Sequence, residues 1–319
     1  MINVYFNSQD KENWIRLSPT GNNVVGNCNF IFDEKELKNY EKIDFLVVFN
    51  QYKKTEYKFN KFNTLVFACE PPSIKKYSTK YLNQFANLVS TFAYDHKNLI
   101  NRTTFFPWHI GINRNQNLQK EDLNFNELKN INPKKKKMIS LIRTAKSMCK
   151  EHDLRNKIFD SIINRFEDQI DVYGRDHKFI SDKKEALLDY HYHICIENYF
   201  GNDFWTEKLS DPLIAKCNPI YLGCRNLKDY FNEKFYHLKL DDLDFNLRFI
   251  EKILKKKEHH FEFEDSRNLI FTKYNLFSFL NYFISANFDD RSTIKSINEE
   301  HNFINTKTLR HKFLGLFKI

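Results

Sequence analysis

Charged and amide side chains gather between two predicted strands in the second half of this chain. The apolar run 193–196 has the length of a buried strand and ends at Glu197-Asn198. Thr206-Glu207-Lys208 then precedes a helix-compatible segment, and a second strand is expected at 219–222. Ligands of open parallel sheets bind beyond the carboxyl ends of the strands, and a helix N-terminus beside a lysine is suited to phosphate. The stretch therefore predicts a βαβ unit with a phosphate site.

Strand-like and helix-like segments alternate along most of the chain around this unit. In the first half, apolar runs at 43–49 and 64–68 have the near-continuous character of strands that are buried on both faces. In the second half, a predicted strand at 138–142 is followed by a predicted amphipathic helix at 149–166. Alternating strands and helices of this kind predict an α/β fold with two successive Rossmann-like domains.

The expected connection between the domains is the polar stretch 113–137, which ends in a lysine run at 134–137. We place the first domain at 1–130 and the second at 131–290. The lysine run is expected to be a solvated edge that leads into a strand. The basic segment 291–319 is expected either to pack as a helix on the first domain or to lie on an anionic membrane surface.

Composition limits the class of protein. The 319 residues are 41% hydrophobic and 16% aromatic, which excludes a disordered chain. No apolar run approaches the ~20 residues of a membrane span, and the first residues lack the pattern of a signal peptide. The six cysteines form no CxxC pair, so we expect reduced core residues in a cytosolic protein. The net charge of +9 favours anionic ligands or surfaces, although no nucleic-acid-binding module is recognisable.

The motifs of the second half resemble those of the α1,3-fucosyltransferases, glycosyltransferase family 10. That family has an F-E-N-S element, then T-E-K-L with a helix, then a V-P-hydrophobic-G ending. The matching residues here are Ile196-Glu197-Asn198, Thr206-Glu207-Lys208-Leu209 and the segment 218–223. Residues 171–175 also match the family's D-V-F/Y-G-R element. The resemblance implies the fold and the donor class more specifically than it implies the sugar.

Within the stretch 190–223, two residues depart from the family pattern. Tyr199 stands where the family has serine, and Pro212 falls inside what is usually an uninterrupted helix. The proline could be the first residue of a helix capped by Ser210 or Asp211. In that case Glu207-Lys208 lies in the turn just before the helix and still faces a phosphate.

The resemblance implies a donor site in the second domain. Arg155 and Lys208 would hold the diphosphate of a nucleotide sugar, the arginine through bidentate hydrogen bonds and the lysine as a point charge. Glu207 would accept hydrogen bonds from ribose or sugar hydroxyls. From the residues alone, Arg155 could instead form a surface ion pair with Glu151, and Glu207 could complement the helix dipole. The other implied donor-binding residues are Tyr173, Gly174, Glu197 and Asn198.

Glu70 is the candidate catalytic residue. It follows the apolar strand 64–68, as the glutamate of the family's E-S-P-S element follows its strand, and by resemblance it would be the general base. Pro71 and Pro72 would stiffen the loop, and partial burial would raise the pKa of the carboxyl. The alternative is a glutamate that only begins a turn. Trp108-His109 could frame the acceptor pocket or pack an interdomain interface.

These features together predict an inverting glycosyltransferase with the GT-B architecture, two Rossmann-like domains facing a cleft. The resemblance implies GDP-fucose as the donor, an oligosaccharide or glycolipid as the acceptor, and an α1,3-type linkage. No DxD, HxxE or clustered His/Asp pattern predicts a metal, so we expect cationic side chains in its place and no cofactor.

Two alternatives stay open. The first is the same fold with a different nucleotide sugar, and the second is a non-catalytic protein that binds glycans or anionic surfaces. In every case we expect no nucleic-acid partner. We expect a cytoplasmic protein that could reach the inner face of the membrane through its basic C-terminal segment.

Overall fold

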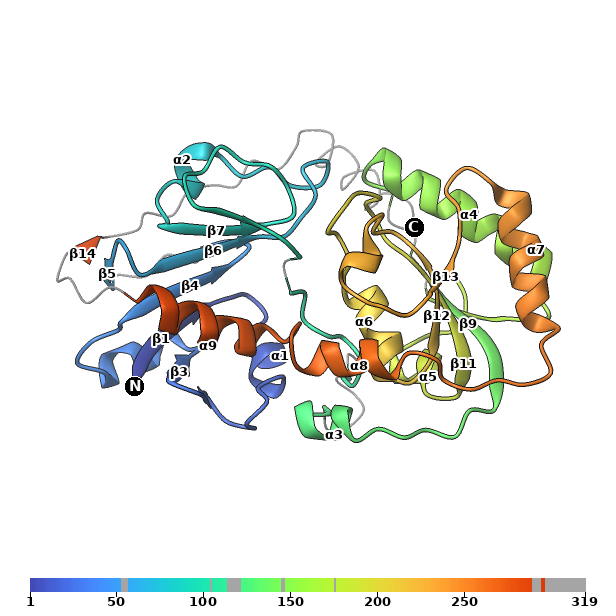
Figure 1. The fold of residues 1–319 in the computed structure, drawn as a ribbon, viewed down its shortest axis with the longest axis horizontal. Coiled ribbons are helices and arrows are strands. Elements are labelled where there is room, and N and C mark those ends of the chain that lie inside the picture. Colours follow the sequence, from blue (N-terminus) through green and yellow to red (C-terminus); the bar gives the residue numbers. More distant parts are fainter. Residues whose placement is uncertain are drawn as a thin grey trace. The chain divides into compact units, whose positions relative to one another are not determined.

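The computed structural model describes residues 1–52, 57–103, 105–113, 122–144, 147–174, 176–288 and 294–295 (Figure 1). The chain divides into two compact units, Met1–Phe106 with Thr272–Ile319, and Pro107–Phe271. Each unit is built on one mostly parallel sheet with helices packed against it, which is the composition of the GT-B type. The predicted α/β class with two Rossmann-like domains is thereby confirmed.

The first unit holds a seven-stranded sheet in the order β2-β3-β1-β4-β6-β7-β8, in which only the β2–β3 pair is antiparallel. The predicted strands at 43–49 and 64–68 are confirmed as β4 and β6. The strands of the sheet are β1 (Ile2–Asn7), β2 (Val24–Val25), β3 (Cys28–Ile31), β4 (Phe45–Phe49), β6 (Thr64–Ala68), β7 (Asn87–Ser90) and β8 (Leu99–Asn101). A separate pair joins β5 (Phe59–Asn60) to β14 (Ile294–Lys295), and the helices are α1 (Lys11–Arg16), η1 (Glu34–Asn39), α2 (Thr79–Leu82) and α9 (Leu276–Asn287).

Both faces of this sheet are buried, because successive residues of a strand point to opposite sides. Tyr5 belongs to an aliphatic and aromatic cluster on one face, which α2 covers. Its neighbour Phe6 lies on the other face, where aromatic rings gather around Phe277 of α9. The ring centroid of Phe277 lies 5.1 Å from that of Phe30. Helix α9 runs over this face in Figure 1, so a helix from late in the chain completes the core of the first unit.

The second unit holds a fully parallel five-stranded sheet in the order β10-β9-β11-β12-β13. The predicted strands and the predicted amphipathic helix at 149–166 are confirmed, the helix as α4. The strands are β9 (Lys137–Arg143), β10 (Asp171–Gly174), β11 (Tyr190–Ile196), β12 (Asn218–Leu222) and β13 (Tyr236–His237). The helices are α3 (Phe125–Lys129), α4 (Lys150–Phe166), α5 (Lys184–Leu187), α6 (Glu207–Ile214), η2 (Leu227–Asp229), α7 (Leu243–Leu254) and α8 (Glu264–Phe271).

The strand order of the second sheet creates a crevice at one edge. The first strand in the chain, β9, lies between the second, β10, and the third, β11. Residues Ile139 and Leu141 of β9 pack against α4 and α7, whereas the hydroxyl of Ser140 points the other way and donates to the carbonyl of Ala186 in α5. Helix α4, which follows β9, and helix α5, which precedes β11, therefore lie on opposite faces of the sheet, and the carboxyl ends of β9 and β11 form the switch point where ligands bind in sheets of this order.

The boundaries between the two units lie at other sequence positions than the predicted 130/131 and 290. Residues 107–113 and 122–130 belong to the second unit, where the Trp108 ring lies 5.9 Å from Phe125 and 5.1 Å from Phe271. Residues 272–288 belong to the first unit, through α9. The polar composition of 113–137 suggested a connection, but buried aromatic residues anchor this part of the chain within the second unit.

The basic segment 291–319 lies outside the described residues except for Ile294–Lys295 of β14. Its packing as a helix and its contact with a membrane surface stay predictions. None of the helices in the described ranges has both the length and the apolar character that crossing a membrane requires.

The lysine run 134–137 is only partly solvated. The ammonium of Lys135 donates to the carbonyl oxygens of Leu187, at 3.1 Å, and Ala215, at 2.7 Å. These carbonyls end α5 and α6, and burial lowers the pKa of Lys135 to about 8. The prediction of a solvated edge is wrong at this position, because the lysine completes two helix ends that would otherwise lack donors.

The packing of α9 can be tested by substituting one residue on each of its faces. We expect Phe277→Ala to lower the free energy of unfolding by about 3–5 kcal/mol, because it leaves a cavity among buried rings. Urea unfolding followed by tryptophan fluorescence measures the loss, since Trp14 lies in the same cluster. Tyr282→Ala, on the same helix but 76% exposed, is the control and should stay within about 0.5 kcal/mol of wild type. Equal losses in the two variants would contradict this role of α9.

Candidate functional site

A pocket of about 90 Å³ lies at the switch point of the second sheet. It is lined by the carboxyl ends of β9 and β11 and by residues of α4 and α6, together with Lys183 and Leu187. Three of the lining side chains are cationic, namely Arg155, Lys183 and Lys208, and two are carboxylates, Glu207 and Asp211. The sequence-predicted phosphate site therefore corresponds to a real concavity with mixed charge.

Glu197 directly follows β11, and its side chain links this strand to the start of the next helix. Its side chain is fully buried, and it accepts hydrogen bonds from the Thr206 main-chain N–H at 2.8 Å and from the Thr206 hydroxyl. The ammonium of Lys208 lies 3.4 Å from the same carboxyl group. Burial raises the pKa of Glu197, and the charge of Lys208 opposes that rise. In the structure Glu197 thus holds the neighbouring loop through Thr206, whereas the resemblance implied contact with the donor.

Helix α6 begins at Glu207, with Thr206 as its N-cap. The Thr206 hydroxyl oxygen accepts from the main-chain N–H of Lys208 at 3.3 Å. Pro212 lies inside the helix, so the alternative in which the helix begins at the proline is wrong. The reason is that Thr206 offers both a cap oxygen and a donor to buried Glu197, and this favours an earlier start over one at Ser210 or Asp211.

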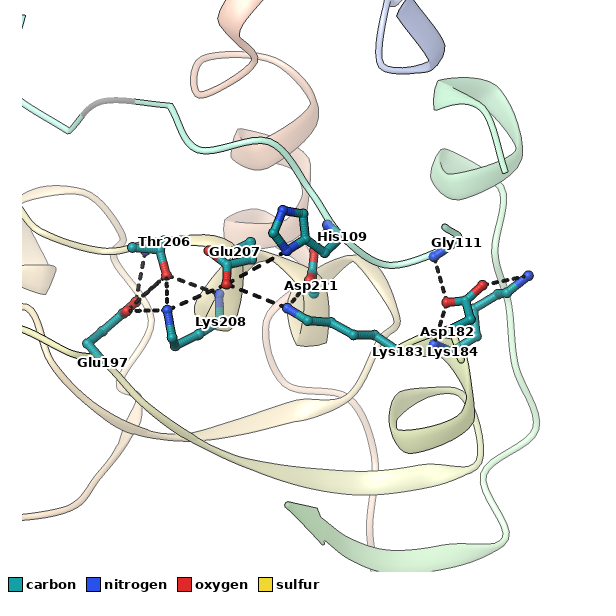
Figure 2. Close-up of polar contacts among 10 residues, drawn as sticks. All are labelled: His109, Gly111, Asp182, Lys183, Lys184, Glu197, Thr206, Glu207, Lys208 and Asp211. Atoms are coloured by element: carbon teal, nitrogen blue, oxygen red, sulfur yellow. Dashed lines mark hydrogen bonds and ion pairs between the residues drawn. The ribbon is translucent and has the colours of Figure 1, made fainter. Parts of the chain in front are cut away.

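Glu207 lies at the centre of a group of cations, which Figure 2 shows. Its Oε1 atom is 3.5 Å from Nζ of Lys208, 3.7 Å from Nζ of Lys183 and 4.0 Å from Nδ1 of His109. Burial favours the neutral carboxyl, but these charges outweigh it and hold the pKa of Glu207 well below its ordinary range. In return, Glu207 and Glu197 raise the pKa of Lys208 above its usual value despite burial. The pair is therefore ionised before any ligand arrives.

Lys183 and Asp211 form the second ion pair of the site. Nζ of Lys183 lies 2.7 Å from Oδ2 of Asp211, whose side chain is 1% exposed. Burial raises the pKa of Asp211, and Lys183 opposes this. The sequence offered a signal for Asp211, because it is four residues after Glu207 and so lies on the same face of α6. No local pattern marks Lys183, which the fold brings to α6 from the residue before α5.

The segment 107–111 is bound to this site through its main chain. The N–H of His109 donates to Asp211 at 3.0 Å, and the N–H of Gly111 donates to Asp182 at 2.9 Å (Figure 2). His109 thereby lies beside Glu207 of the predicted donor site, although the sequence suggested an acceptor-side role. Trp108 is 4% exposed and packs against Phe125 and Phe271 within the second unit, as the packing alternative expected.

Arg155 is buried near the start of α4, with 3% of its surface exposed. Its Nη2 donates to the hydroxyl of Thr144, just beyond β9, at 3.0 Å. Burial lowers the pKa of its guanidinium, and the charge of Glu197 opposes that change. A surface ion pair with Glu151 is therefore wrong as an account of this residue, since the side chain points into the pocket region.

The remaining predicted donor residues lie at different distances from the pocket. Asn198 follows Glu197, and its Oδ1 is buried without a hydrogen-bond partner among the described residues. Asn198, Tyr173 and Gly174 are not among the residues that line the pocket. The Tyr173 hydroxyl bonds instead to that of Tyr190 at 2.8 Å, at the amino end of β11. Gly174 has φ of +117°, and a Cβ there would lie 2.0 Å from the carbonyl oxygen of Arg143.

Glu70 lies in the first unit, where it follows β6 and is half-buried. Pro71 begins a turn, because its carbonyl accepts from the N–H groups of Ile74 and Lys75. The preceding residue, Cys69, donates its N–H to Oδ1 of Asn50 at the end of β4. Glu70 therefore stands at the carboxyl edge of the first sheet on a braced loop, as the sequence predicted for a strand-end carboxylate.

A residue pair that sequence reasoning did not place is His193 and Ser140. Both are buried on neighbouring strands, and Oγ of Ser140 lies 2.8 Å from Nδ1 of His193. Because the single hydroxyl proton of Ser140 goes to the Ala186 carbonyl, the imidazole Nδ1–H donates to Ser140. Burial lowers the pKa of His193 to about 3. This histidine is therefore a neutral part of the pocket wall. Across the described ranges, no group of three or more His, Cys, Asp or Glu residues could hold a metal ion.

Comparison with known proteins bears on the same segment. Residues 132–264 match the model of glycosyltransferase family 10 (fucosyltransferase), C-terminal part, which confirms the predicted resemblance and the glycosyltransferase class. No curated protein matches the chain. Among solved structures, an α1,3-fucosyltransferase with GDP-fucose is 15% identical, with 92% of each chain covered and a TM-score of 0.47. An α1,3-fucosyltransferase with GDP is 16% identical, with coverage of 91% of this chain and 92% of that chain and a TM-score of 0.44.

The buried imidazole of His193 predicts a dependence of stability on pH. Its pKa is lower in the folded protein than in the unfolded chain, so the unfolded state binds more protons between about pH 3 and pH 6.5. Stability should therefore fall as the pH drops through this window. Between pH 7 and pH 5, wild type should lose about 2 kcal/mol more than His193→Asn, whose amide can still donate to Ser140. Urea unfolding at both pH values measures this difference, and parallel losses would show that His193 is not buried in neutral form.

Proposed function

We propose that this chain, whose residues 132–264 match the C-terminal part of the glycosyltransferase family 10 model, transfers fucose from GDP-fucose to a hydroxyl of an oligosaccharide or glycolipid. The observation that carries this proposal is the pocket at the switch point of the second sheet, where Arg155 and Lys208 converge at the N-terminal turns of α4 and α6. A nucleoside diphosphate brings the negative charge that these groups favour. The family model that matches this segment is described as a fucosyltransferase, which supports fucose as the transferred sugar.

In this proposal the diphosphate lies between α4 and α6. The guanidinium of Arg155 offers planar paired donors, and the ammonium of Lys208 offers a compact charge. Both groups are already ionised and held by neighbouring side chains, so they need little reorganisation when negative charge develops on the leaving group. Positive charge thus comes from side chains, and the proposal needs no metal or other cofactor.

In the proposal, Glu207 beside the cations and Asn198 just after β11 bind the hydroxyl-bearing parts of the donor. Glu207 is ionised and has hydrogen-bond capacity for ribose or fucose hydroxyls. Asn198 offers an amide oxygen that is buried without a partner among the described residues, and a donor hydroxyl would satisfy it. Tyr173 and Gly174 would support the site through the sheet edge only, because their contacts are to Tyr190 and Arg143.

The chemical step in the proposal is an inverting displacement. Glu70 takes the proton of an acceptor hydroxyl, and the hydroxyl oxygen forms a bond to the anomeric carbon of fucose. The bond from that carbon to the β-phosphate oxygen breaks on the opposite face, and its electron pair leaves with GDP. A β-linked donor thereby gives an α-linked product, for which an α1,3 linkage is our expectation. We also propose a cytoplasmic location, with contact to the inner face of the membrane through residues 291–319.

Donor binding is tested by calorimetry with GDP, GDP-fucose, GDP-mannose, UDP and CMP. We expect wild type to bind GDP and GDP-fucose, and Lys208→Ala to weaken both at least about tenfold, because a charge contact to the diphosphate is lost. Lys157→Ala is the control, since Lys157 is exposed on α4 only two residues from Arg155. Arg155→Met gives a second test if Lys208→Ala melts early. Binding of UDP or CMP instead would change the sugar class, and no nucleotide binding would contradict a transferase.

The general base is tested by transfer kinetics on Glu70→Gln. We expect kcat to fall by a factor of about 10²–10⁴, because the acceptor hydroxyl loses its proton acceptor, while the Kd for GDP-fucose stays unchanged. Glu36→Gln, an exposed glutamate of the same unit, is the control. Unchanged kcat in Glu70→Gln would assign the base to another residue, and a non-catalytic glycan-binding protein would show no turnover in any variant.

A further inference from the structure

Lys183 has a position in the pocket that no motif predicted. It immediately precedes α5, lines the pocket, and has 23% of its side chain exposed. Its ammonium lies 2.7 Å from Asp211 and 3.7 Å from Glu207, two carboxylates on the same face of α6. Figure 2 shows the side chain extending between them. The contact with Asp211 is the shorter of the two and fixes the ammonium of Lys183, which at this position also faces Glu207.

Asp211 is in turn fixed on its other side. Its Oδ1 accepts the main-chain N–H of His109, and its Oδ2 takes Lys183, so both oxygens are occupied. A carboxylate that is 1% exposed and bound in this way cannot swing away when a ligand arrives. Lys183 is therefore tied to the scaffold rather than available to follow a phosphate.

We propose that Lys183 is a positioning residue of the donor site, which, anchored by Asp211, holds the Glu207 carboxylate ionised and oriented toward the hydroxyl groups of the nucleotide sugar. This inference rests on the proposed function, because it assigns Glu207 to the donor. It gives Lys183 a role through Glu207 and not through the diphosphate.

The need for such a residue follows from the other charges that face Glu207. Lys208, from the same helix, divides its charge between Glu207 and buried Glu197, and in the proposed complex it also contacts the diphosphate. His109, from the segment before, lies 4.0 Å away and acts as a cation only when protonated. Thr206 contributes a neutral hydroxyl. Lys183 is thus the cation that stays with Glu207 when Lys208 turns to the ligand.

The coupling of Lys183 to Glu207 can be measured without any nucleotide. In protein labelled at the glutamate side-chain carboxyls with ¹³C, Glu207→Gln assigns the Glu207 signal, and its titration gives the pKa. We expect Lys183→Met to raise the pKa of Glu207 by about one unit or more, because an opposite charge is removed. Lys184→Met is the matched control, since its ammonium pairs with Asp182 at 3.0 Å instead. An unchanged pKa in Lys183→Met would overturn the proposal.

Binding of GDP-fucose then shows whether this coupling serves the donor. We expect Lys183→Met and Glu207→Gln each to raise the Kd about tenfold, and the double variant to be no worse than either. Lys183→Arg should restore most of the affinity, and Lys184→Met should bind as wild type does. Additive losses in the double variant would mean that Lys183 contacts the donor itself, which would overturn the positioning role.

The two proposals fail in distinguishable ways. If wild type binds no GDP-fucose, the proposed function fails, while the carboxyl titration still reports whether Lys183 controls Glu207. If wild type binds GDP-fucose but Lys183→Met binds it equally well, the proposed donor site is supported and the proposed role of Lys183 is contradicted. A thermal melt of each variant excludes loss of folding as the cause of weak binding.

Discussion

The buried carboxyl group of Glu197 is the constraint on which the rest of the site depends. A fully buried acidic group is costly unless hydrogen bonds and charge compensate for its lost hydration. Here two donors of Thr206 and the ammonium of Lys208 supply that compensation. Gly223, at the end of β12, makes room for the group, because a Cβ there would lie 2.4 Å from Cγ of Glu197. The carboxyl end of β11 and the start of α6 are thereby fixed to one another.

Each further element of the site follows from this junction. Thr206 is at once the partner of Glu197 and the cap of α6, so the first turn of the helix has one orientation. Glu207 and Lys208 then face the pocket, and Asp211 follows one turn later. Asp211 orders the segment that carries His109, and with it the ammonium of Lys183. A single helix thus arranges side chains that are remote in the sequence.

The sequence alone predicted those parts of the molecule that depend on local patterns. Near-continuous apolar runs predicted β4 and β6, and apolar residues at four-residue spacing predicted α4. These patterns are local, because a buried strand or helix face requires apolar residues at regular spacing within the element itself. The sequence left two starts open for α6, because the choice of Thr206 as the cap depends on a buried partner nine residues earlier, just after β11. The boundary near residue 107 was missed for a similar reason. Polar residues suggested a linker, while Trp108 and Phe125 reach a helix more than a hundred residues later.

The balance of charge in the pocket explains why such distant residues are needed. Arg155, Lys183 and Lys208 line it against Glu207 and Asp211, and Glu197 is buried beside Lys208. A site with only the cations would favour any polyphosphate, whereas the carboxylates repel an anion that brings no hydrogen-bond donors of its own. A nucleotide sugar brings hydroxyl groups together with its diphosphate, so it can satisfy both kinds of group at once. On the proposed function, the site would select its ligand through the placement of its carboxylates, and Lys183 and Asp211 would keep that placement unchanged when the negative charge of the donor enters.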